Sequence, residues 1–260
     1  MTRQHIDLLE FSELPAPVYF RYADFDAHRF APAHRHPWGT LEYSAHGVLR
    51  MDIGGRRFMS PPQYALWVPP RTEHSFYSAQ PIHYRAVCLA PPICRDLPPH
   101  ACTLAISDIL KAILKDFAAR DVKIPERDAD VRLAQVLVDQ LQQAPVHECY
   151  LPYAHSAGLL GILEALQAAP GDNRPLAHWA ERIHVSERTL ARQFVRELGM
   201  SFGEWRQRLR FVASIEALDS TRSIQEIAFD MGYSTSSAFI AMFVRQARCT
   251  PEQYRRHKFL

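Results

Sequence analysis

The spacing of hydrophobic residues along the chain changes near residue 100. Before that point, apolar and aromatic residues form short runs, broken by Pro, Gly and Asp, at 17–22, 40–43, 47–53, 64–68 and 84–89. Short, closely spaced runs of this kind predict the strands of an antiparallel barrel or sandwich. The pair Gly54-Gly55 separates 48–53 from 56–59 and predicts a tight hairpin, because both glycines can adopt a positive φ.

After residue 100 the apolar residues recur at helical spacing. Ile106, Ile109, Ile113 and Phe117 follow one another every three or four residues, and a second such series occupies 131–141. The segment 144–153 contains two prolines and is expected to be a linker before a wholly helical remainder. We therefore predict a two-domain α+β fold, with a β-barrel over 1–100, a helical linker region over 101–153 and an all-α domain over 154–260.

A near-repeat occupies the helical C-terminal part. The segment 176–180 recurs as 224–228, an offset of 48 residues that becomes 49 after one insertion. The residues that follow in order are Ser186, Leu190, Phe194, Ser201 and Trp205 in the first copy, and Ser234, Phe239, Phe243, Thr250 and Tyr254 in the second. Each copy predicts a short helix, a turn, a serine N-cap and a second helix, which together form a helix-turn-helix.

The second helix of each unit has an outward face near its N-terminus, where a recognition helix meets base edges in the major groove of DNA. In the first unit this face comprises Glu187, Arg188, Ala191 and Arg192, because Leu190, Phe194 and Leu198 form the buried stripe. In the second unit, Gly232 is expected to form the turn and Ser234 the cap, and the outward residues are Thr235, Ser236, Ser237, Ala241 and Arg245. Taken singly, an exposed arginine is more often simply solvated, but the repeat favours DNA reading. The small polar residues of the second unit predict contacts to phosphate or to few bases.

These motifs resemble the DNA-binding domain of the AraC/XylS family of transcription regulators. Residues 183–194 read IHVSERTLARQF, and 227–256 read IAFDMGYSTSSAFIAMFVRQARCTPEQYRR. The resemblance covers about the last hundred residues and implies two recognition helices on one face, joined by a long helix over 202–218. It further implies a double-stranded DNA operator as partner, with RNA polymerase as a further candidate partner.

Charge and cysteine content add little to this picture. The net charge is +2 overall, with 16 Lys+Arg against 17 Asp+Glu over 1–155 and 14 against 11 over 156–260. The basic residues of the C-terminal part are all arginine except Lys258, and arginine suits bidentate recognition of phosphate and guanine. The five cysteines contain no C-x-x-C pair, which predicts reduced thiols. No signal segment or long apolar run is evident, so we expect a cytoplasmic protein without a membrane partner.

A second group of candidate residues lies in the N-terminal part. His34 and His36 are two apart on a strand-like run, which places them on one face, and His74 opens a later run. With Glu42 they resemble the metal set of a cupin, which predicts a cupin-like antiparallel β-barrel. The spacing from His36 to Glu42 is longer than in cupins, and the glycine expected before the third histidine is missing, so a divalent metal and a metal-free polar pocket both stay open. Tyr19, Trp38, Tyr43, Trp67 and Phe76 are candidate wall residues for a small effector, or plain core residues.

The sequence thus predicts a sensor barrel joined to a DNA-reading domain, without catalytic residues and without a required cofactor. The helices around Ile109 and Ile113 are expected either to pack on the barrel or to form a homodimer interface. A first alternative is a cupin metalloenzyme that carries a DNA-binding module. A second is a constitutive architectural DNA-binding protein whose barrel only dimerises.

Overall fold

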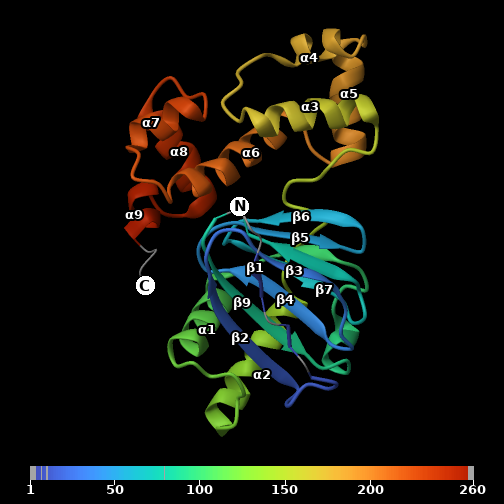
Figure 1. The fold of residues 1–260 in the computed structure, drawn as a ribbon, viewed down its shortest axis with the longest axis vertical. Coiled ribbons are helices and arrows are strands. Elements are labelled where there is room, and N and C mark those ends of the chain that lie inside the picture. The colour runs from blue at the N-terminus through green and yellow to red at the C-terminus, as the bar shows by residue number, and fades with distance from the viewer. Residues whose placement is uncertain (1–3, 7, 10, 79, 257–260) are drawn as a thin grey trace. The chain divides into compact units, whose positions relative to one another are not determined.

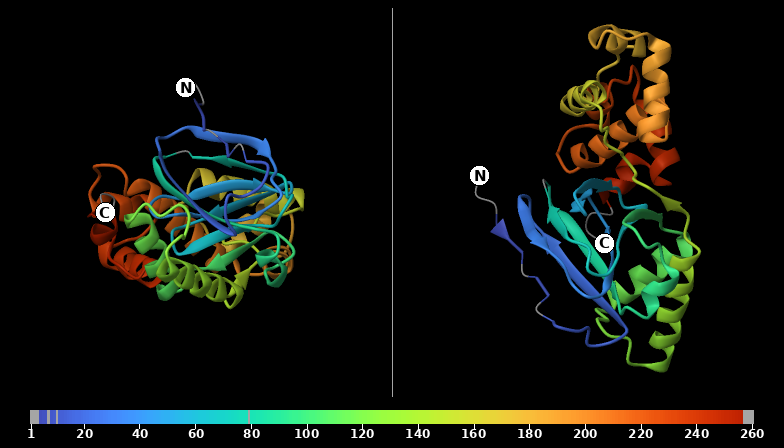
Figure 2. Two further views of the ribbon diagram at one scale, coloured as in Figure 1. Left: turned by 90° about the horizontal axis from the view of Figure 1, so that it is seen from below. Right: turned by 90° about the vertical axis from the view of Figure 1, so that its right-hand side faces the viewer.

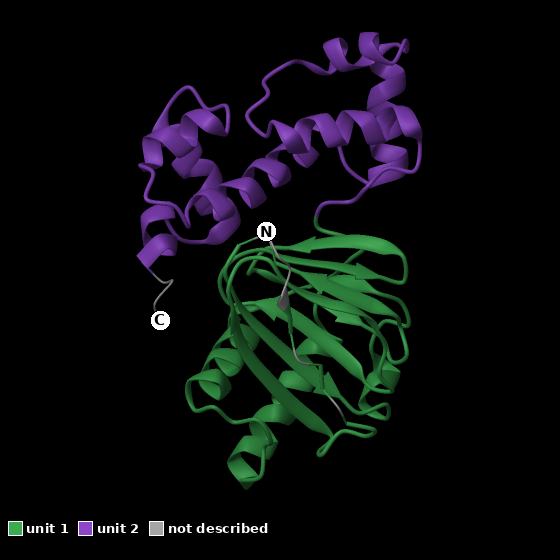
Figure 3. Ribbon diagram, viewed as in Figure 1, with its two compact units in different colours: residues 1–150 green, residues 151–260 purple. Residues whose placement is uncertain are grey.

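The computed structural model describes residues 4–6, 8–9, 11–78 and 80–256. The chain divides into two compact units, Met1–Tyr150 and Leu151–Leu260, which are coloured separately in Figure 3. The predicted change from strands to helices near residue 100 therefore falls inside the first unit. The helical region over 101–153 belongs with the sheets for most of its length.

The first unit contains two facing sheets (Figure 1). One has the order β1 (Gln4–His5), β3 (Arg29–His34), β8 (His74–Tyr77), β5 (Leu49–Ile53) and β6 (Arg56–Ser60). The other has the order β11 (Val146–His147), β10 (Cys102–Ala105), β7 (Tyr64–Val68), β4 (Gly39–Ser44), β9 (Ile82–Leu89) and β2 (Val18–Phe25). A 3-10 helix, η1 (Ile93–Asp96), follows β9. The pairings of the described strands give a cupin-like sandwich of two sheets rather than one closed barrel, and β1 pairs with β3 in parallel.

The predicted hairpin is confirmed. Gly54 and Gly55 have φ values of 57° and 76° and connect β5 to β6. Alternation along the strands then decides which side chains face which layer. In β4, Thr40 and Glu42 point to the space between the sheets, whereas Leu41 and Tyr43 point to the opposite face. Both faces are covered, and every residue of β4 is buried.

The helices α1 (Asp108–Ala119) and α2 (Asp128–Gln142) cover the outer face of the six-stranded sheet, as the turned view of Figure 2 shows. Ser107 caps α1 by accepting a hydrogen bond from the backbone N–H of Leu110 at 3.1 Å. Phe117 packs its ring on that of Phe20, with centroids 4.6 Å apart. Ile113 is 5% exposed in the same cluster, whereas Ile109 is 57% exposed. Ile113 therefore belongs to the packing on the sheet, and Ile109 does not.

The second unit is wholly helical, as predicted. Its helices are α3 (Ala157–Ala168), α4 (Leu176–Arg182), α5 (Glu187–Leu198), α6 (Phe202–Ala217), α7 (Ile224–Asp230), α8 (Ser236–Ala247) and α9 (Pro251–Arg256). Trp179 and Trp205 are fully buried in this unit. Among the helices of the described residues, none is both long and apolar enough to cross a membrane.

The contrast between two isoleucines one turn apart on α1 can be measured. We expect Ile113→Ala to lower the free energy of unfolding of the first unit by about 2–5 kcal/mol, since it leaves a cavity beneath the helix. Ile109→Ala should change it by less than about 0.5 kcal/mol, because that side chain is exposed. Urea unfolding of the full chain measures both. Equal losses for the two variants would show that α1 does not pack through this face.

Candidate functional site

A cavity of about 160 Å³ lies between the two sheets. The six-stranded sheet lines it with polar groups and small side chains, and the five-stranded sheet contributes apolar and imidazole groups. The principal lining residues are Arg21, Thr40, Glu42, Tyr84, Cys88, Met51, His74 and Phe76, together with Ile6, Leu8, Leu9 and Phe11 of the N-terminal segment. An apolar cavity of about 150 Å³ is large enough for benzene, so this space suits a molecule near the size of one aromatic ring.

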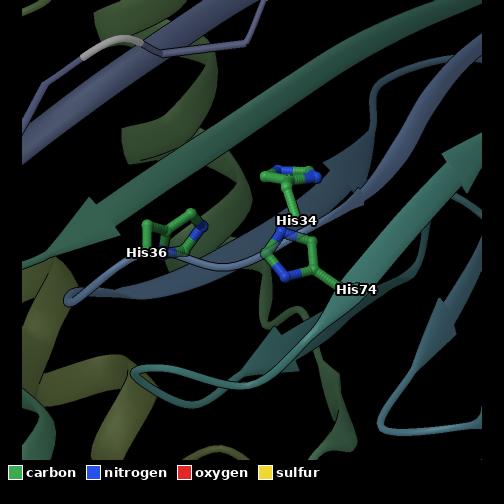
Figure 4. A group of neighbouring side chains, drawn as sticks. All are labelled: His34, His36 and His74. Atoms are coloured by element: carbon green, nitrogen blue, oxygen red, sulfur yellow. The ribbon is translucent and has the colours of Figure 1, made fainter.

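Three histidines meet at this cavity (Figure 4). His34 ends β3, His36 lies in the connection to β4, and His74 begins β8, where it pairs directly with His34. The ring centroids of His34 and His74 are 4.3 Å apart, and those of His36 and His74 are 4.9 Å apart. The nitrogen atoms that the three rings offer lie within 4.8 Å of one another. The structure thus brings together the three histidines that the sequence analysis singled out.

Each of these rings is held through the same atom. Nδ1 of His34, His36 and His74 lies 2.9, 2.8 and 2.9 Å from the carbonyl oxygens of Pro32, Trp38 and Thr72, respectively. A carbonyl oxygen only accepts, so each Nδ1 carries the proton and donates it. Nε2 is therefore the nitrogen that has a free electron pair in the neutral ring.

Burial keeps the three rings neutral. Desolvation lowers the pKa of each histidine, and that of His36 falls to about 4, with the neighbouring His74 as a further cause. Removing a charge from water costs more than the backbone hydrogen bonds recover, so the uncharged form is favoured. At neutral pH the cluster offers three neutral imidazoles to the cavity.

Glu42 faces the cavity but lies outside the three-histidine cluster. It is 3% exposed, and burial raises its pKa, while a hydrogen bond from Tyr84 lowers it. One carboxyl oxygen, Oε2, is buried and has no hydrogen-bond partner among the described residues. Burial also raises the pKa of the neighbouring Cys88 thiol to about 12, which keeps it protonated. The floor of the cavity therefore holds one carboxyl group with an unused acceptor.

Of the predicted wall residues, the structure places two at the cavity and three elsewhere. Trp38 and Phe76 line it. Tyr43 and Trp67 point to the opposite face of their sheet, where they pack with the core beneath α1 and α2, and Tyr19 lies edge-on to Phe11 with centroids 5.6 Å apart. The sequence analysis missed Arg21, Thr40, Tyr84 and Cys88. The available signal was their position on the strands. Each lies an even number of residues from a cavity residue on the same strand, or is paired with a cavity residue on the neighbouring strand.

The second unit contains the two predicted helix-turn-helix motifs. In the first, His184 at φ 56° forms the turn between α4 and α5, and Ser186 caps α5 by accepting from the backbone N–H of Thr189 at 3.2 Å. Glu187, Arg188 and Arg192 are exposed on α5, and Ala191 is half-buried. The buried stripe comprises Leu190, Phe194 and Leu198, as predicted.

The second motif differs from the first by one residue in its turn. Gly232 forms the turn at φ 78°, as predicted, but the predicted cap was wrong. Thr235, not Ser234, caps α8, and it accepts from the backbone N–H of Ala238 at 3.2 Å. The inserted residue lengthens the turn, so the cap moves one position along the chain. Thr235, Ser237, Ala241 and Arg245 are exposed, and Ser236 is half-buried.

Aligning the two caps pairs the positions of the reading helices. Ser186 corresponds to Thr235, so Arg192 corresponds to Ala241 and Arg188 corresponds to Ser237. Arg196, which the sequence analysis did not include, corresponds to Arg245. Arg196 is exposed on α5, and the 49-residue offset was the signal that could have found it.

A buried arginine connects the segment before the first motif with the turn of the second. Arg210 of α6 is 7% exposed and donates to the carbonyl oxygens of Pro170 and Asp172 at 3.1 and 3.0 Å. It also donates to Oδ1 of Asn173 at 2.8 Å, and Nδ2 of Asn173 donates to the carbonyl oxygen of Gly232 at 2.7 Å. These bonds fix the turn of the second motif against the segment that leads into the first.

Comparison with known proteins agrees with this geometry. A model of the AraC-like ligand binding domain matches residues 15–119, and a helix-turn-helix domain model matches 179–257. The chain is 32% identical over 226 residues to the HTH-type transcriptional regulator NimR of Escherichia coli (strain K12), which covers 86% of this chain and 82% of NimR. It is 33% identical over 93 residues to RipA of Corynebacterium diphtheriae, and there the match spans 36% of this chain and 28% of RipA. The structure of ToxT from Vibrio cholerae matches with 11% identity and a TM-score of 0.39, over 92% of this chain and 98% of that chain.

The fold and its two sites define a transcription regulator that has a ligand-binding domain followed by a DNA-binding helix-turn-helix domain. The chain belongs to the AraC family of such regulators. The resemblance in the C-terminal sequence is thereby confirmed, as is the cupin-like class of the N-terminal fold.

The displaced cap of the second motif has a direct test in two adjacent hydroxyl residues. We expect Thr235→Ala to lower the free energy of unfolding by about 0.5–2 kcal/mol, because it removes the acceptor for an N–H at the start of α8. Ser234→Ala should change it by less than about 0.5 kcal/mol. Chemical denaturation of the full chain compares the two. The reverse order of losses would restore Ser234 as the cap.

Proposed function

We propose that this regulator reads a DNA operator with the outward faces of α5 and α8, and that a small molecule in the cavity between the sheets controls that binding. The observation that carries the proposal is the pair of capped motifs connected through Arg210, each with an exposed face at the start of its second helix. A recognition helix inserts that end into the major groove.

The two reading helices offer different chemistry to DNA. Arg188 and Arg192 on α5 are exposed, and a guanidinium forms two parallel hydrogen bonds with O6 and N7 of guanine. At the matching positions α8 has Ser237 and Ala241, which lack such a group. We therefore assign most of the base discrimination to α5, and phosphate contact with little base reading to α8.

The effector is a compact molecule, because the cavity of about 160 Å³ fits little more than one ring. Trp38, Met51 and Phe76 would cover its apolar body, and the three histidines and Glu42 would meet its polar groups. Binding and not catalysis is the proposed role of this cavity, since NimR and RipA are both transcriptional regulators.

A homodimer is the proposed working form. Packing on the sheet leaves apolar side chains on the outer surfaces of α1 and α2, namely Ile109, Val131 and Val136, which are 57%, 50% and 42% exposed. Exposed branched side chains favour association with a second copy. Function on an operator further implies a cytoplasmic location, with RNA polymerase as a further proposed partner.

The first test of the proposal is a pair of arginine variants. Arg192→Ala should weaken binding to the operator by about 1–3 kcal/mol and relax the preference at one base position, because it removes a base-reading group. Arg132→Ala, which removes an exposed positive charge from α2 in the other unit, should leave binding unchanged. Fluorescence anisotropy at fixed salt on the operator and its single-base variants measures both. An equal effect of the two variants would contradict reading by α5.

A second test addresses the dimer. Ile109→Glu should raise the dissociation constant of the dimer at least about tenfold, because burying an isoleucine is worth about 1.5–3 kcal/mol and a carboxylate opposes it. Lys111→Glu changes the surface charge in the same direction on another side of α1 and serves as the control. Analytical ultracentrifugation of the full chain gives the association state. A wild-type chain that is monomeric throughout would exclude this interface.

A further inference from the structure

We propose that His34, His36 and His74 bind one divalent transition-metal ion and that the open coordination position of this ion receives a donor atom of the effector. The proposal deepens the effector pocket and rests on it. The alternative is a metal-free pocket, in which the three histidine side chains would contact the effector directly.

The three candidate ligand atoms converge on one end of the cavity. The three imidazoles come from three chain segments, the end of β3, the following connection and the start of β8, and their nitrogens lie within 4.8 Å of one another. A tetrahedral ion with bonds of about 2.1 Å to nitrogen requires ligand atoms about 3.4 Å apart. The three rings lie next to one another (Figure 4), and an ion would have to draw their nitrogens from within 4.8 Å to that spacing.

The hydrogen bonds that hold the three rings also favour metal binding. Histidines that bind metal nearly always donate their other ring N–H to a carbonyl or carboxylate, which orients the ring and fixes the tautomer. All three histidines do so here, through Nδ1 to the carbonyls of Pro32, Trp38 and Thr72. A pocket that only needed polar contacts would not require the same tautomer three times.

A threonine hydroxyl group faces one of the ligand nitrogens. Oγ1 of Thr40 lies 3.2 Å from Nε2 of His36 and donates to it. A hydroxyl group rotates freely about its C–O bond, so the Thr40 proton turns away when the ion takes the electron pair of Nε2. The Thr40 hydroxyl therefore competes only weakly with the ion for His36.

One coordination position of the ion stays open toward the cavity in this arrangement. Three imidazoles leave a fourth position free on an ion that prefers four ligands. The cavity of about 160 Å³ is lined by the same histidines, and Glu42 faces it from the other sheet with an Oε2 that has no hydrogen-bond partner among the residues that the structure describes. This carboxyl lies outside the three-histidine cluster and would bind the effector rather than the ion. The effector is thus a ring-sized molecule with an oxygen or nitrogen donor for the ion and a hydrogen-bond donor for Glu42.

The chemistry of the ligands limits the ion. Imidazole nitrogen suits Zn²⁺, Cu²⁺, Ni²⁺, Co²⁺ and Fe²⁺, whereas Mg²⁺ and Ca²⁺ prefer oxygen. Co²⁺ is the useful probe, since its visible absorption reports the number and type of its ligands.

The test uses the full chain without a histidine tag, stripped of metal with a chelator and titrated with Co²⁺. We expect one ion per chain and a visible absorption band. His36→Gln and His74→Gln should each weaken Co²⁺ binding at least roughly tenfold, whereas His100→Ala, which removes an exposed histidine outside the cluster, should not. Circular dichroism of the metal-free variants verifies their folding. Binding below one ion per chain, or binding that the cluster variants leave unchanged, would overturn the site.

Acetohydroxamate then probes the open position. Adding it to the Co²⁺-loaded chain should shift the absorption band, because its oxygens replace water on the ion. An unchanged spectrum would refute the free position and with it the proposed contact to the effector. The Arg192→Ala comparison on DNA does not involve the ion, so a failed metal titration would leave the proposed DNA reading standing, and the converse also holds.

Discussion

The arrangement of the two helix-turn-helix motifs depends on one buried guanidinium. Arg210 has two backbone carbonyls and the side chain of Asn173 as acceptors, and Tyr233 lies against it with the ring centroid 5.5 Å away. A buried charge is tolerated only when such partners replace water, and a hydrogen bond to a charged group is worth about 1.5–3 kcal/mol. Asn173 extends the network to the turn at Gly232. The network therefore joins the segment that leads into the first motif to the turn of the second, and α5 and α8 are the helices that we propose read one DNA site.

A different constraint organises the sensor unit. The six-stranded sheet is covered on both faces, so neighbouring residues of one strand serve two cores. In β4 this alternation directs Leu41 and Tyr43 toward α1 and α2, while Thr40 and Glu42 reach the cavity. The histidines come from the end of β3, the start of β8 and the connection between β3 and β4. The imidazole groups and Glu42 thereby face the space between the sheets, and the apolar packing beneath α1 and α2 lies on the other face of the six-stranded sheet.

Much of the fold and part of the candidate site could be predicted from the sequence. The predictions that failed concern features that tertiary packing decides. Residue spacing predicted the Gly54-Gly55 hairpin and the two helix-turn-helix motifs of the second unit. It also predicted that His34, His36 and His74 meet. The sequence could not show that Trp38 lines the cavity whereas Tyr43 and Trp67 lie on the other face of the sheet. A strand covered on both faces has no alternation of polar and apolar residues that would distinguish its two sides. Ser234 and Thr235 are adjacent hydroxyl residues, and only the length of the folded turn decides which one caps α8. Exposure of Ile109 likewise follows from how α1 sits on the sheet.

The central claim is that α5 and α8 read one DNA site as a connected pair. Methylation and missing-contact interference at single-base resolution, with the full chain on its operator, tests it most directly. The account predicts two separate runs of interfering bases in successive major-groove segments, about 10 base pairs apart, with the stronger base dependence in the run that faces α5. A single run of interfering bases, or equal base dependence in two runs, would contradict it.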